Sequence, residues 1–74
     1  HAVFPDQLRQ ILVQGIREAQ LAGQIAPQAY PPHLADMLLN QIIGLGVRGV
    51  IDPARYPAEK LRGLFAQLFA LILK

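Results

Sequence analysis

Hydrophobic and polar positions divide the chain into three segments with helical spacing, at about residues 6–22, 33–51 and 57–73. In the first segment apolar residues recur every three or four positions and make one stripe, which includes Leu8, Ile11, Leu12 and Ile16. Glutamines and charged residues occupy the other side of this segment. No stretch alternates apolar and polar residues with the period of two that is typical of a strand. The pattern therefore predicts an all-α chain of three helices.

The second and third segments are apolar around more of their circumference than one neighbouring helix covers. A helix packed on a single partner needs an apolar stripe a little over about 100° wide. In the second segment, apolar residues and glycines spread over about half of the helical wheel at about 100° per residue. A chain of 74 residues has little surface of its own to cover this excess. We therefore expect these helices to associate with another chain.

Each of these two helices divides into two apolar sectors. The sectors expected to face the chain's own core consist of Leu34, Leu38, Ile42, Leu45, Leu61, Leu64, Leu68 and Leu71. The sectors assigned to a partner consist of Leu39, Ile43, Gly46, Val47, Val50, Phe65, Phe69, Ile72 and Leu73. The pattern is also compatible with the opposite assignment, in which the two sectors exchange roles.

Proline and glycine separate the three predicted helices. Gly23 stands where a left-handed residue would end the first helix. Pro31 and Pro32 suit the first turn of the second helix, where a missing amide costs no hydrogen bond. Pro53 disfavours helical angles at Asp52, so the second helix is expected to stop there.

Three glycines inside the second predicted helix, Gly44, Gly46 and Gly49, require an explanation. Each glycine costs about 1 kcal/mol relative to alanine in a helix interior. The helix could kink or fray before Asp52, or the glycines could permit close contact with another helix. We favour close contact, because large apolar residues alternate with the glycines.

The composition excludes several classes of protein. With 53% hydrophobic and 16% charged residues the chain is not disordered. The longest run without a formal charge is Met37–Val47, shorter than the roughly 20 apolar residues of a spanning helix, so no membrane segment is expected. The seven Lys and Arg residues form no run, which argues against tight DNA binding by this chain alone. The absence of cysteine rules out disulfides and suits a cytoplasmic protein.

Candidate chemistry is sparse. The chain has no Ser, Thr or Cys nucleophile, and its five carboxylates form no pair on a shared helix face. We expect no enzyme, no catalytic residues, no metal and no cofactor. His33 and Asp36 are expected to form a local pair at the start of the second helix. Tyr30 and Tyr56 either cover helix ends or touch a small molecule, and Gln41 is either exposed, bonded across an interface or in a pocket.

Three stretches resemble the C-terminal regulatory region of TetR-family transcriptional regulators: GIREAQLAGQIAP, HLADMLLNQIIGLGVRG and EKLRGLFAQLFALI. Members of that family commonly carry an E-x-Q-x-A-G-x-I phrase, a proline-containing linker and an L-A-x-x-L-L helix with an internal glycine before a leucine. The corresponding residues here are Glu18–Ile25, Leu34–Leu39 and Gly44-Leu45. The resemblance covers nearly the whole chain in style and spacing.

The resemblance implies a function. Residues 1–74 would form a single dimerisation domain and part of an effector-binding domain, with the last two helices making a four-helix bundle across a homodimer. A small hydrophobic effector would bind in the intact repressor, and Leu8, Ile11, Leu12 and Gln41 are candidate pocket residues. DNA would bind only through an N-terminal helix-turn-helix that this chain lacks. The chain begins at His1 rather than Met, and we expect a piece of a longer protein. The alternative is a free-standing helical module that docks on another protein.

Overall fold

The computed structural model describes residues 3–74, with side chains from Asp6 onward, and contains three helices in this range. They are α1 (Val3–Leu21), α2 (Pro31–Ile51) and α3 (Ala58–Ile72). No described residue lies in a strand, so the prediction of an all-α, three-helix chain is confirmed. The main difference is at the first helix, which begins at Val3 rather than near residue 6. Asp6 consequently lies within its first turn, where a carboxylate complements the helix dipole.

Gly23 ends α1 in the left-handed conformation predicted from the sequence, with a φ of 75°. The amide of Gln24 donates to the carbonyl of Ala19 at 2.8 Å, and the amide of Gly23 donates to the carbonyl of Gln20 at 3.0 Å. These two bonds are the pair that defines a Schellman motif. They satisfy carbonyls that the end of the helix would otherwise leave free, and the chain turns sharply away from α1.

The linker between α1 and α2 is held by a side chain that the sequence did not single out. The amide nitrogen of Gln20 donates to the carbonyl of Ala26 at 3.0 Å and to the carbonyl of Ala29 at 2.7 Å. The linker also buries Ile25 in the core. Partly buried backbone carbonyls need partners, and Gln20 supplies them where no regular structure can. The linker therefore has a defined path into α2.

The prolines act as predicted at both ends of α2. Pro31 and Pro32 occupy its first turn, after Tyr30 in an extended conformation. The helix ends at Ile51, and Asp52 leaves the helical region with a φ of −135° and a ψ of 67°. The ring of Tyr30 meets the ring of His33 edge-on, with centroids 4.7 Å apart.

The core lies where α1 crosses the first half of α2. Its buried members are Ile16, Ile25, Ala35 and Leu38, and α3 adds Leu68 and Ile72 from its C-terminal half. On α1, Leu12, Ile16 and Ala19 pack in the core and are three or four positions apart, and Leu34 or Ala35 precedes Leu38 by four or three positions on α2. Each helix therefore presents a continuous apolar stripe at the crossing.

One ion pair joins the outer sides of α1 and α2. The Nε of Arg9 donates to Oδ1 of Asp36 at 2.6 Å, with both side chains about half exposed. The hydrogen bond and the charge of this carboxylate raise the pKa of Arg9. The sequence analysis expected Asp36 to pair with His33, but Asp36 pairs with Arg9 of α1 instead. The sequence prediction was local, and it overlooked a longer side chain that reaches across the helix crossing.

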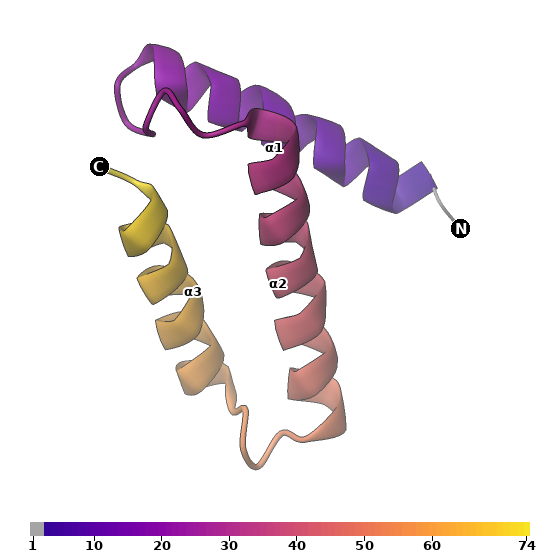
Figure 1. Ribbon diagram of the computed structural model, residues 1–74. Helices are drawn as coiled ribbons and strands as arrows, with labels where there is room; N and C mark the ends of the chain where they lie inside the picture. Colours follow the sequence, from indigo (N-terminus) through magenta and orange to yellow (C-terminus); the bar gives the residue numbers. More distant parts are fainter. Residues whose placement is uncertain (1–2) are drawn as a thin grey trace.

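The three helices form an open arrangement rather than a closed bundle (Figure 1). α1 crosses the N-terminal end of α2, whereas α2 and α3 form a hairpin whose turn lies far from that crossing. The radius of gyration is 13.5 Å, against about 11 Å for a compact chain of this length. The smallest dimension is 13 Å, so broad faces of the helices remain uncovered.

The glycines of α2 have different surroundings. α2 is helical without interruption to Ile51, so the glycines neither break nor fray it. A Cβ at Gly49 would lie 2.9 Å from Cδ1 of Leu61, which places α3 close against this glycine. Nothing lies within 4 Å of a Cβ built at Gly44 or Gly46. Close contact within the chain therefore explains Gly49 and leaves Gly44 and Gly46 open.

Candidate association surface

A strip of exposed apolar side chains runs along the second half of α2. Ile43, Val47 and Val50 belong to it, and Val50 is 84% exposed. Together with Ile42, Gly46 and Ile51 they line a shallow groove made almost entirely of carbon. We call these six residues the α2 strip. Four of them, Ile43, Gly46, Val47 and Val50, are among those that the sequence assigned to a partner.

Leu39 was assigned to the partner-facing sector together with the α2 strip, but it is buried within the single chain. It lies a full turn closer to the crossing with α1, where the chain covers both apolar sectors of α2. The core-facing assignment of Leu38 agrees with its burial, and Leu34, Ile42 and Leu45 are half-buried. On α2, therefore, the distance from the crossing decides exposure as much as the face of the helix does.

The buried and exposed faces of α3 do not coincide with the two sectors expected from the sequence. The partly buried side chains of α3 are Leu61, Phe65, Leu68 and Ile72, taken from both expected sectors. Their spacing of four, three and four residues is that of a single helical stripe. The large exposed apolar residues of this region are Leu64, Phe69 and Leu71 on α3 and Leu73 directly after it. Phe69 and Leu73 remain accessible members of the expected partner surface, whereas Ile72 packs on the core.

A second apolar hollow opens between α1 and the end of α3. Its lining consists of Ile11, Leu12, Gly15, Ile16, Ala19, Ile25, Leu38, Phe69, Ile72 and Leu73. Ile11 and Leu12, which were expected to line an effector pocket, therefore line the same hollow as Phe69, Ile72 and Leu73, which were expected at a dimer interface. Ile11 is 68% exposed at the rim. The hollow offers no polar side chain to orient a ligand.

The other two expected pocket residues lie elsewhere. Gln41 is exposed and lines a separate groove between α2 and α3, with Met37, Asn40 and Leu68 among its neighbours. Leu8 is half-buried and belongs to neither hollow. The structure thus brings together two of the four predicted pocket residues.

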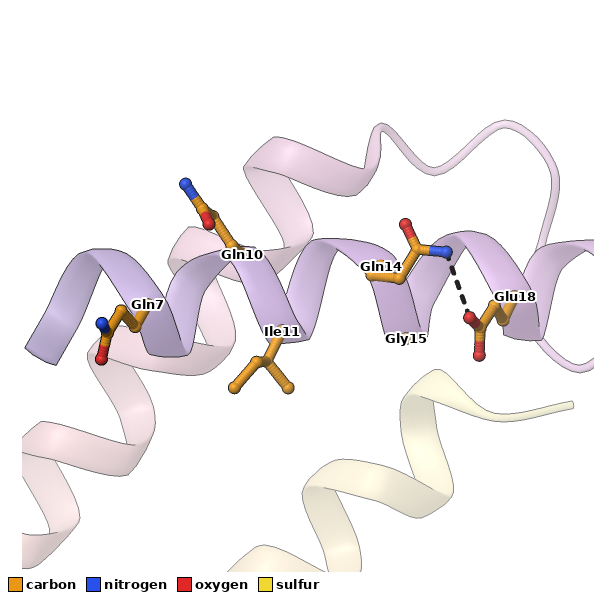
Figure 2. A pocket seen from close by; sticks show the side chains of 6 residues that line it. All are labelled: Gln7, Gln10, Ile11, Gln14, Gly15 and Glu18. Carbon is orange, nitrogen blue, oxygen red and sulfur yellow. Dashed lines mark hydrogen bonds between the residues drawn. The ribbon is translucent and has the colours of Figure 1, made fainter.

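Figure 2 shows one face of α1 from close by, where polar side chains lie beside Ile11 and Gly15. Gln7, Gln10, Gln14 and Glu18 follow one another along the helix, and Gln14 donates a hydrogen bond to Glu18 at 3.1 Å. All of these residues belong to one helix, so they form an open surface rather than an enclosed site. This face agrees with the one-sided pattern of the first predicted helix.

By length and composition alone, α2 is apolar enough to cross a membrane. The charge-free run from Met37 to Val47 had predicted no segment of that kind. The helix also carries the charges of Asp36 and Arg48, and charged residues inside spanning helices are rare and costly. These two charges argue against a span that includes the whole of α2.

No protein-family model, no curated protein and no solved structure matches the chain.

Proposed function

We propose that this chain is a dimerisation domain and part of an effector-binding domain of a TetR-type transcriptional regulator. The observation that carries the proposal is the α2 strip, which is apolar, continuous and exposed on a single chain. A second copy would cover it with the same strip, with Phe69 of its α3 and with Leu73, which follows that helix. A two-fold axis allows such self-complementary packing, since the same surface then serves both subunits.

The total surface of the chain supports association. A folded monomer of 8.2 kDa exposes about 4,500 Å², whereas this chain exposes 5490 Å². The difference is close to the area that each partner contributes to a protein interface of ordinary size, about 800 Å². Gly46 lies in the middle of the α2 strip with open space above it, so a side chain of the partner can approach the backbone there.

The rest of the proposed function depends on the resemblance to the TetR family. The hollow between α1 and α3 suits a small hydrophobic effector, because its lining is apolar. The hollow is open on one side, and helices of the intact regulator would complete it. DNA would be bound by a separate N-terminal domain, and effector binding would shift the populations of conformers that set the spacing of the DNA-reading heads.

Sedimentation of the chain at micromolar concentration tests the dimer. We expect a dimer, and we expect Val50→Asp to weaken it at least tenfold, since a carboxylate would be buried at the interface. Leu21→Asp is the matched control, because Leu21 is 90% exposed on α1, outside the α2 strip. Its dimer should sediment like that of the unsubstituted chain.

A monomer at every concentration would contradict the proposal. It would favour the alternative, a helical module that docks on a different protein. Leu71 of α3 is exposed and lies outside the surface proposed for the dimer. A different protein that covers Leu71 would account for this exposure, and this observation favours the alternative. Equal weakening by both aspartate substitutions would show that association does not use the α2 strip.

A further inference from the structure

The end of the α2–α3 hairpin carries the net charge of the chain. Residues 48–62 contain four of the seven Lys and Arg residues and two of the five carboxylates, which accounts for the whole formal charge of +2. The basic residues are scattered in the sequence, but the turn between α2 and α3 brings them to one end of the molecule (Figure 1). We call this end, residues 48–62, the hairpin tip.

Two cations of the hairpin tip meet on one aromatic ring. The guanidinium carbon of Arg48 is 5.5 Å from the ring centroid of Tyr56, and Nζ of Lys60 is 4.6 Å from the same centroid. Nη1 of Arg48 also donates to the hydroxyl of Tyr56 at 3.3 Å. Both distances lie within the range of a cation–π interaction. Tyr56 therefore holds two like charges near one ring, and its attraction to each offsets part of their mutual repulsion.

Neither of these cations is neutralised by a carboxylate in the described part of the chain. The ion pairs there are Arg9 with Asp36 and Arg55 with Asp52, the second at 3.8 Å. Asp52 also accepts a hydrogen bond from the backbone amide of Arg55 at 3.4 Å. Asp52, which also lines the hollow that adjoins these residues, is thus paired with Arg55, and neither Arg48 nor Lys60 forms an ion pair with a carboxylate of the described residues.

A hollow of about 520 Å³ adjoins this arrangement and is lined by Gly44, Val47, Arg48, Ile51, Asp52, Arg55 and Tyr56. Arg48 is exposed at this hollow, so its guanidinium is accessible to an anion from solvent. The guanidinium of arginine has a planar fork of donors that matches the oxygens of phosphate and carboxylate groups. Since one nitrogen of Arg48 is used by Tyr56, the other donors remain for a ligand.

We propose that the hairpin tip binds a phosphate-type oxyanion. Arg48, which lines the hollow, and Lys60, which lies over the same Tyr56 ring, supply the charge that holds it. Tyr56 is a positioning residue that keeps Arg48 at the hollow. The proposal goes beyond the proposed function, because the binding of an anion requires neither the dimer nor the hydrophobic effector. The hollow borders the α2 strip and shares Val47 and Ile51 with it. The phosphate group can belong to a free anion or to the headgroup of an anionic lipid.

Titration of the full chain with inorganic phosphate at constant ionic strength, followed by ¹H–¹⁵N NMR, tests the site. We expect saturable shifts centred on the amides of residues 48–60. Arg48→Gln and Lys60→Gln should each weaken binding about tenfold, as expected for the loss of one charge-assisted contact. Tyr56→Phe should weaken it in the same direction, because the hydroxyl that positions Arg48 is lost.

Arg17→Gln is the matched control, since it removes the same charge from an exposed position on α1. Its affinity should equal that of the unsubstituted chain, and equal weakening by Arg17→Gln would overturn the proposal in favour of a net-charge effect. Co-sedimentation with phosphatidylcholine vesicles, with and without phosphatidylglycerol, identifies the source. Binding to the phosphatidylglycerol vesicles alone assigns a lipid headgroup, and saturation by inorganic phosphate assigns a free anion.

The proposed site is overturned if the chain shows neither saturable NMR shifts with inorganic phosphate nor co-sedimentation with phosphatidylglycerol vesicles. The sedimentation test of the dimer is independent of this result, because Arg48→Gln and Lys60→Gln leave the α2 strip unchanged. A chain that dimerises without binding phosphate would therefore retain the proposed function and lose the anion site.

Discussion

At the scale of single residues, the glycines of α2 differ in what surrounds them, although the sequence presents them as one group. Gly49 lies against Leu61, whereas Gly44 has open space where a side chain would be. The helical pattern alone could not separate them, because it contains no information on how closely α3 approaches. Gly23 is the opposite case, since its place after a helical stripe was enough to predict its positive φ.

This difference predicts that alanine stabilises the chain more at Gly44 than at Gly49. Gly44→Ala should stabilise the chain by up to about 1 kcal/mol, because alanine is the better helix former and nothing obstructs its methyl group. Gly49→Ala should gain less or lose stability, because Cδ1 of Leu61 must move away from a Cβ only 2.9 Å distant. Urea unfolding at one fixed protein concentration measures both. A larger gain for Gly49→Ala than for Gly44→Ala would contradict the packing described here.

At the scale of elements, α1 and α2 are joined by a core that the sequence predicted and by an ion pair that it did not. Ile16 and Leu38 lie on stripes that any helical wheel identifies. Arg9 and Asp36 are 27 residues apart in the chain, and their pairing depends on how α1 and α2 cross, which no local pattern determines. For the same reason the sequence did not predict that Leu39 is buried within the single chain, or that the partly buried residues of α3 come from both expected sectors.

A double-mutant cycle on Arg9→Ala and Asp36→Ala should give a favourable coupling that shrinks as salt is added, because both side chains are partly solvated. The raised pKa of Arg9 fixes the sign of the pH dependence. A group whose pKa is higher in the folded state contributes its full stability below its ordinary pKa and loses it only above the folded value. The coupling should therefore persist unchanged from neutral to moderately alkaline pH. A coupling that vanishes over that range would mean that the pair does not form in solution.

At the scale of the whole molecule, the α2 strip is uncovered because the arrangement of the three helices is open. The three helices do not close a bundle, so apolar residues that would be core in a larger protein face water. The sequence predicted this excess from composition and from the contrast with α1. It could not locate the charged tip, because Arg48, Tyr56 and Lys60 come together only when the hairpin forms.

If the dimer forms, thermal stability becomes a property of concentration. The midpoint of unfolding should rise as the total protein concentration is increased, because the folded dimer is favoured by mass action over two unfolded chains. Circular dichroism melts across a wide concentration range measure this shift. Val50→Asp should reduce the dependence on concentration, whereas Leu21→Asp should retain it. A midpoint that is constant for the unsubstituted chain would indicate that the folded species is monomeric.

The amide of Lys74 donates to the carbonyl of Gln24 at 2.7 Å, which fastens the last residue beside the α1–α2 linker (Figure 1). Leu73 is already extended at this point, with a φ of −82° and a ψ of 139°. The two ends of the hairpin are thus connected twice, by the turn between α2 and α3 at one end and by the hydrogen bond of the Lys74 amide at the other. A fluorescent reporter or surface anchor fused after Lys74 would therefore be held at the crossing end of the molecule. The hairpin tip would point away from it, free for ligands to reach.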